Sequence, residues 1–193
     1  MQEAEAMLKM GVDVRFLNLR AHQHFFEKAY PDLPIPCLYV DSPRLASDLL
    51  YAYDAVVGTV YHSLSWMDLP KTGGRLPVRG YYIQDFEPNF FPKGSPEYQA
   101  AWDSYTRFPN LVRITKTAWN RQMILDQIGV DCHVVGASLD LELFRPRQRK
   151  DPNWPDRPLR ITAMVRPSTP RRQPGFTLQV LQEMLRRHAG TIE

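Results

Sequence analysis

Short apolar runs alternate with helical segments along most of the chain, and this alternation most limits how it can fold. The runs predicted as strands cover residues 14–18, 35–40, 55–60, 79–84, 111–115 and 132–135. The segments predicted as helices cover residues 1–10, 44–53, 96–107 and 117–128. The runs are apolar on both faces, which is typical of parallel strands with helices on both sides. The pattern therefore predicts the α/β class with a doubly wound parallel sheet.

The alternation stops at a stretch rich in proline and basic residues. Residues 145–158 read RPRQRKDPNWPDRP and are interpreted as a linker. Beyond them the sequence predicts a strand over residues 159–165, a loop rich in Pro and Arg, and a helix from about residue 175 to 187. We therefore expect a first domain over residues 1–144 and the start of a second domain over residues 159–193.

Both predicted domains look incomplete. A single β-loop-α unit is too small to bury a core of its own, so the second domain is expected to be truncated. A doubly wound domain usually opens with a strand, whereas residues 1–10 are already predicted to be helical. The first domain is therefore expected to lack its first strand, and the chain to be a fragment.

Composition and charge exclude several classes of protein. Of the 193 residues, 44% are hydrophobic, and 24 Lys and Arg against 21 Asp and Glu leave a net charge of +3. That charge is too small for a nucleic-acid footprint, and no apolar run approaches the roughly 20 residues of a membrane-spanning helix. Two cysteines without a CxxC pair, and no signal-peptide pattern at the start, predict a cytoplasmic location. His22 and His24 lack a third ligand nearby in sequence, so no metal site is predicted.

Residues 134–146 carry the first of several resemblances to a known family. Their sequence, VVGASLDLELFRP, resembles the strand–Gly–Val–Asp–x–x–x–Phe–x–Pro segment that closes the N-terminal domain of retaining glycosyltransferases of family 4. The Asp, Phe and Pro of that pattern match, whereas Ser138 and Leu139 stand where the family usually has Gly and Val. The resemblance implies a GT-B fold, in which two Rossmann-like domains face each other.

Residues 160–176, RITAMVRPSTPRRQPGF, resemble the first strand and loop of the donor-sugar domain in the same family. In that loop an Arg and a Lys bind the donor diphosphate; Arg166 matches the Arg, and Arg172 falls where the Lys is expected. These arginines also lie between a predicted strand end and a helix start, where parallel sheets bind phosphate, and Arg suits paired phosphate oxygens. Arg171 is expected to be a surface residue. The alternative for the whole segment is a solvated basic loop.

Residues 81–92, YYIQDFEPNFFP, are similar, together with the RPSTPRR loop, to a bacterial branch of the family that includes an S-layer glycan rhamnosyltransferase. In this interpretation Asp85 is the candidate catalytic group, able to accept a proton or orient a hydroxyl. Gln84 and Glu87 would lie near the sugar or acceptor, and His62, at another strand end, would hydrogen-bond a sugar hydroxyl. Three alternatives remain open: a glycosidase carboxylate pair, a GT-A metal motif, and carboxylates that cap nearby backbone.

The resemblance implies a complete function for the full-length enzyme. It would transfer a sugar such as rhamnose from a nucleotide diphosphate sugar to a surface polysaccharide, with retention of configuration and without a metal or other cofactor. Its partners would be the nucleotide sugar and a glycan acceptor, with peripheral membrane association through the acceptor and no nucleic acid. The family's donor-domain Glu pair would lie beyond residue 193, so we expect this chain alone to be inactive and to bind nucleotide weakly.

Aromatic side chains near the expected cleft are candidates for stacking on sugars, although aromatics are more often core residues: Trp66, Phe86, Phe90 and Phe91. The rival to an enzyme is a non-catalytic doubly wound domain that binds a small ligand or a protein partner.

Overall fold

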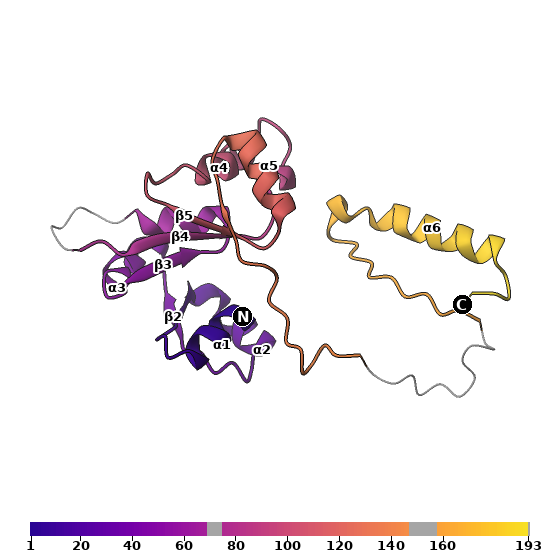
Figure 1. Cartoon of the computed structure of the whole chain (residues 1–193), viewed down its shortest axis with the longest axis horizontal. Helices are drawn as coiled ribbons and strands as arrows, with labels where there is room; N and C mark the ends of the chain where they lie inside the picture. The colour runs from indigo at the N-terminus through magenta and orange to yellow at the C-terminus, as the bar shows by residue number, and fades with distance from the viewer. Residues whose placement is uncertain (69–74, 147–157, 193) are drawn as a thin grey trace. The chain divides into compact units, whose positions relative to one another are not determined.

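The computed structural model describes residues 1–68, 75–146 and 158–192. The chain divides into two compact units, Met1–Leu141 and Glu142–Glu193, called unit 1 and unit 2 below. Unit 1 holds two parallel sheets and their helices, which confirms the prediction of an α/β fold built on parallel strands (Figure 1). Most of the linker predicted over residues 145–158 lies outside the described residues.

Strands and helices of unit 1 follow the predicted alternation, with short 3-10 helices (η) in several connections. Their bounds are α1 Gln2–Lys9, β1 Phe16–Leu19, η1 Arg20–His22, α2 Gln23–Ala29, β2 Cys37–Val40, η2 Pro43–Ala46, α3 Ser47–Leu50, β3 Ala55–Gly58, η3 Tyr61–Met67, β4 Val78–Ile83, η4 Glu87–Phe90, α4 Pro96–Ser104, β5 Val112–Thr115, α5 Ala118–Ile128 and β6 His133–Val134.

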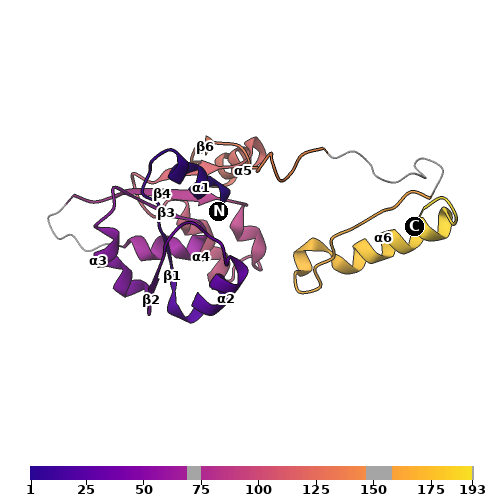
Figure 2. The same cartoon turned by 90° about the horizontal axis from the view of Figure 1, so that it is seen from below.

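The strands form two sheets, where the sequence predicted one doubly wound sheet. One sheet pairs β1 with β2, and the other has the order β3-β4-β5-β6. Strand order in the larger sheet follows the chain, so the reversal that defines a doubly wound sheet does not occur within it. The two sheets are joined by side chains: Val56 and Trp66 pack against the small buried core of Val40, Ala46 and Leu50. Figure 2 shows α2 beside β1 and β2. The rings of Phe26 in α2 and Phe16 in β1 lie 6.2 Å apart.

The main core lies on one face of the larger sheet. Consecutive parallel strands with right-handed connections place those connections on a single face, and α4 and α5 lie together on one side of β3–β5 (Figure 1). Tyr81 and Ile83 of β4 point to this face and are fully buried. The ring of Tyr105, just after α4, lies 5.5 Å from that of Tyr81 and stacks on Phe86 at 5.7 Å. This aromatic packing holds the C-terminal end of β4 against the segment that follows α4.

Unit 2 confirms one predicted element and corrects another. The helix expected over residues 175–187 is α6, Pro174–Arg187, and it follows the short η5, Pro170–Arg172. The strand predicted over residues 159–165 does not form; among the described residues, Leu159 makes only an isolated bridge to Ile192. A strand needs a partner to satisfy its backbone groups, and the described part of unit 2 offers none along this segment.

None of the helices in the described parts of the chain is both long enough and apolar enough to cross a membrane. The cytoplasmic location expected from the cysteines and the chain start remains a prediction.

Candidate functional site

Polar side chains gather where β3, β4 and β5 end. Because parallel strands share one carboxyl edge, the segments after Gly58, Ile83 and Thr115 emerge on the same side of the sheet. Gln84 joins these segments: its side-chain amide donates to the carbonyl of Thr59 at 3.1 Å, and its own carbonyl accepts from the Asn120 amide at 3.2 Å. Gln84 itself is exposed. The edge is therefore an ordered group of loops with an accessible amide at its centre.

Asp85 is half-buried directly after Gln84. One carboxylate oxygen accepts the N–H of Phe86 at 2.9 Å, and the Tyr105 hydroxyl donates to the Asp85 carbonyl at 3.4 Å. The first bond is that of a loop carboxylate capping adjacent backbone, one of the alternatives that the sequence left open. Both bonds hold Asp85 at the end of β4, where it remains the candidate for proton transfer.

Glu87 occupies a different place from the one that its sequence position suggested. Only 3% of the residue is exposed, and one carboxylate oxygen accepts the N–H of Tyr61 at 2.7 Å. Burial raises the pKa of the Glu87 carboxyl, while the Tyr61 N–H and the Tyr81 hydroxyl oppose that rise. Glu87 thus contacts protein groups in this structure, where the sequence placed it beside the sugar or acceptor. The apolar residues on either side of it, Phe86 and Pro88, are the sequence signal that could have indicated this, and both are buried.

His62 lies at the start of η3, one residue after Tyr61, and is exposed. Its ring is perpendicular to that of Tyr61 at 5.2 Å, and partial desolvation lowers the pKa of the imidazole. A lowered pKa favours the neutral ring, which donates one hydrogen bond and accepts another. Such a ring can either donate to a sugar hydroxyl or accept from it.

The structure separates the aromatic candidates into two groups. Phe86 is buried, with its ring stacked on Tyr105, and Trp66 packs against the small core beside β2. Phe90 is 36% exposed, and its ring lies 6.4 Å from that of the half-buried Phe91. Of the four aromatic candidates, Phe90 is therefore the most accessible to a ligand, Trp66 and Phe91 are half-buried, and Phe86 is closed off in the core.

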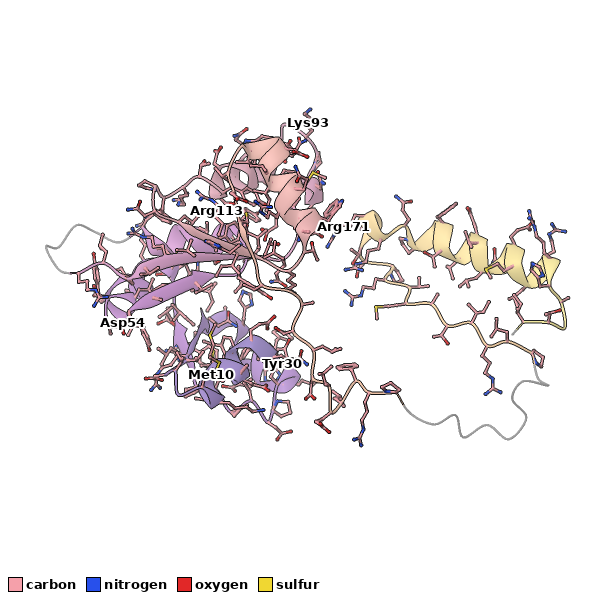
Figure 3. The ribbon with its side chains drawn as sticks, viewed as in Figure 1. Met10, Tyr30, Asp54, Lys93, Arg113 and Arg171 are labelled. Carbon is pink, nitrogen blue, oxygen red and sulfur yellow. The ribbon has the colours of Figure 1, made fainter. Side chains whose placement is uncertain are left out.

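The arginine loop of unit 2 is built from successive turns. The N–H of Thr169 donates to the Arg166 carbonyl and the N–H of Arg172 to the Thr169 carbonyl, both at 3.0 Å. Arg166, Arg171 and Arg172 are exposed, and Figure 3 shows Arg171 beside the turn that leads into α6. Gln173 then takes the left-handed conformation, at φ 49°, and Pro174 begins α6.

No side chain caps the N-terminus of α6. The first N–H groups of a helix have no partner within it and carry a partial positive charge. Next to the exposed arginines, they form a region of unit 2 that suits an anion such as a phosphate.

Sequence reasoning missed two residues that support the site in unit 1. Tyr105 accepts the N–H of Glu87 through its hydroxyl at 3.2 Å, and Asn120 fixes the backbone of Gln84. Neither stands near residues 84–87 in sequence, so no local pattern could reveal them. Within residues 1–68, 75–146 and 158–192, no group of three or more His, Cys, Asp or Glu side chains is arranged to hold a metal ion.

Similarity to known proteins does not assign the chain to a family. The chain matches no protein-family model, no curated protein and no solved structure.

Proposed function

We propose that the chain is part of a GT-B glycosyltransferase that uses a nucleotide diphosphate sugar as donor and a glycan as acceptor. The observation that carries the proposal is the arginine loop of unit 2, which leads directly into an uncapped helix N-terminus. The resemblance of residues 160–176 to the donor-binding loop of family 4 enzymes supports it independently of the geometry.

The chemistry of sugar transfer gives the arginine loop its role. Negative charge grows on the leaving diphosphate as its bond to the sugar breaks, and positively charged groups fixed in place stabilise it. Arg166 and Arg172 each offer a planar set of donors to the phosphate oxygens, and the N-terminal N–H groups of α6 add backbone donors. In this proposal these groups supply the positive charge, and no metal or other cofactor is given a role.

On the acceptor side, the carboxyl edge of unit 1 offers groups suited to a sugar hydroxyl. Asp85 would orient the attacking hydroxyl or accept its proton. Gln84 and the imidazole of His62, whose lowered pKa favours the neutral ring, are exposed and would hydrogen-bond the glycan. A polysaccharide acceptor, a donor sugar such as rhamnose, retention of configuration and peripheral membrane association belong to the proposal through the resemblance alone.

Replacing Arg166 with alanine is expected to weaken binding of nucleoside diphosphates by about tenfold, because one charge-assisted contact to phosphate contributes about 1.5 kcal/mol or more. Arg172→Ala should weaken it by a similar factor. Nuclear magnetic resonance titration with UDP, GDP and dTDP measures both, with the Gly175 and Phe176 amides at the start of α6 as reporters. Weak binding requires nucleotide concentrations up to about 10 mM.

Arg171→Ala is the matched control, because it removes the same charge from the same loop and should change affinity less than about twofold. Equal losses for Arg166→Ala and Arg171→Ala would mean that the loop acts only through its net charge and that the assignment of single contacts is wrong. If the unmodified protein binds neither nucleoside diphosphates nor nucleotide sugars, the non-catalytic binding domain becomes the better interpretation.

A further inference from the structure

A buried carboxylate connects the two loops that carry His62 and Asp85. The Glu87 side chain accepts the N–H of Tyr61, which opens η3, at 2.7 Å. The N–H of Glu87, which opens η4, donates to the Tyr105 hydroxyl at 3.2 Å, and that hydroxyl donates to the Asp85 carbonyl at 3.4 Å. One chain of hydrogen bonds thus runs from the residue before His62 to the backbone of Asp85.

A neutral side chain could make the contact to Tyr61, so the fold does not require a carboxylate there. Burying a charge costs free energy. The charge of Glu87 lies near Asp85 and the Tyr81 and Tyr105 hydroxyls, and within the described residues no basic group contributes to the shift of its pKa. The Tyr81 hydroxyl is itself buried and makes no hydrogen bond of normal geometry within the described residues. Costly buried groups of this kind are commonly kept to position a functional site.

We propose that Glu87 is a positioning residue, which fixes η3 to the end of β4 and thereby sets where His62 stands relative to Asp85. The role of His62 and Asp85 in binding the acceptor rests on the proposed function. The positioning of the two loops by Glu87 does not depend on it. Without the carboxylate, the Tyr61 N–H loses its acceptor. The two loops are then joined by the Gln84 side-chain bond to the Thr59 carbonyl and by ring contacts such as that of Tyr61 with Phe91, at 5.5 Å, and neither of these holds the Tyr61 backbone.

Amide hydrogen exchange and a histidine titration of the labelled full chain test the proposal. In Glu87→Ala the Tyr61 amide should exchange roughly tenfold faster or more, because a partly buried donor loses its acceptor. The amide of Gly129, which donates to Leu125 at the end of α5, should keep its rate. The pKa of His62 should rise toward its ordinary value of 6.5 as its ring becomes solvated.

Two variants separate positioning from bulk stability. Glu87→Gln keeps an acceptor oxygen and should restore both the Tyr61 exchange rate and the His62 midpoint. Asn89→Ala, at an exposed position of the same η4, should leave both unchanged. The proposal is overturned if Glu87→Ala leaves Tyr61 and His62 unaltered, or if it accelerates exchange at Tyr61 and Gly129 equally.

The unmodified protein provides a test that needs no variant to fold. The Tyr61 amide proton faces the Glu87 carboxylate, so its chemical shift should titrate with a midpoint above 4.5, the ordinary value for glutamate. A shift that does not titrate between about pH 3 and pH 9 would show that Tyr61 is not held by an ionisable Glu87. All these measurements are made without nucleotide, so their outcome is independent of whether Arg166 binds a nucleoside diphosphate.

Discussion

Replacing Ile83 with alanine is expected to destabilise unit 1 by about 2–5 kcal/mol. Ile83 is fully buried at the end of β4, which pairs with β3 on one side and β5 on the other, and its side chain belongs to the main core. Removal of its outer atoms leaves a cavity. The paired strands and the packed core around it cannot move enough to close this cavity, so both transfer energy and packing energy are lost. Chemical unfolding followed by circular dichroism measures the change.

Val78→Ala is the matched control in the same strand. Val78 points to the opposite face of β4 and is 52% exposed, so its truncation should cost less than about 1 kcal/mol. Small domains are stable by only about 5–15 kcal/mol, so Ile83→Ala could unfold the protein altogether. Ile83→Val, expected to cost about 0.5–1.5 kcal/mol, then gives the same ranking. Equal costs for the variants at Ile83 and Val78 would contradict the assignment of the buried face.

Local sequence signals were enough to predict the elements that begin and end with strong caps. The helix expected over residues 117–128 is α5, Ala118–Ile128. It begins where predicted because the Thr117 side chain accepts the N–H of Asn120 at 3.1 Å. It ends where predicted because Gly129 adopts φ 80°, a conformation that glycine reaches without strain. In such places the residue that fixes a boundary is itself part of the pattern.

Features that depend on distant partners could not be predicted in the same way. Residues 159–165 have the pattern of a strand but pair with no strand in the described part of the chain, so the propensity is not realised. The division into two sheets depends on how Val56 and Trp66 pack, which no periodicity reveals. Residues 44–53, predicted as one helix, form parts of η2 and α3 that together end at Leu50.

The residues of the candidate site also differ in whether local sequence or distant contacts determine their place. Gln84, Asp85 and His62 follow strands, so the shared carboxyl edge of a parallel sheet was enough to expect them near one another. The burial of Glu87 depends on Tyr61 and Tyr105, which approach it from other parts of the chain. An alternating or apolar pattern reports which face a residue takes but not which distant group satisfies a buried carboxylate.

Replacing Gly58 with alanine is expected to destabilise unit 1 by about 1–3 kcal/mol through overpacking. Gly58 ends β3, and a Cβ atom there would lie 2.8 Å from Ser63 Oγ, 3.1 Å from Met67 Cε and closer still to Leu64 Cδ2. Leu64 and Met67 are buried in the main core and cannot withdraw without opening it. Thermal and chemical unfolding measure the loss.

The same substitution should also disturb the turn that carries His62. Ser63 Oγ accepts the N–H of Thr59 at 3.1 Å and donates to the carbonyl of Val60 at 2.7 Å, which closes the start of η3. Displacing this hydroxyl loosens the segment between β3 and His62. We therefore expect the His62 ring resonances to shift in Gly58→Ala even at temperatures where the protein remains folded.

Gly80→Ala is the control that distinguishes this local crowding from a general intolerance of side chains in the sheet. The three atoms nearest to a Cβ atom at Gly80 all belong to Val57, whose nearest methyl would lie 3.2 Å away. Val57 is 49% exposed, so its side chain has room to turn aside. We expect a cost below about 1 kcal/mol and unchanged His62 resonances. If Gly80→Ala proves as damaging as Gly58→Ala, the cost arises from the glycine backbone itself, and the close packing of η3 on the end of β3 is not what holds His62 in place.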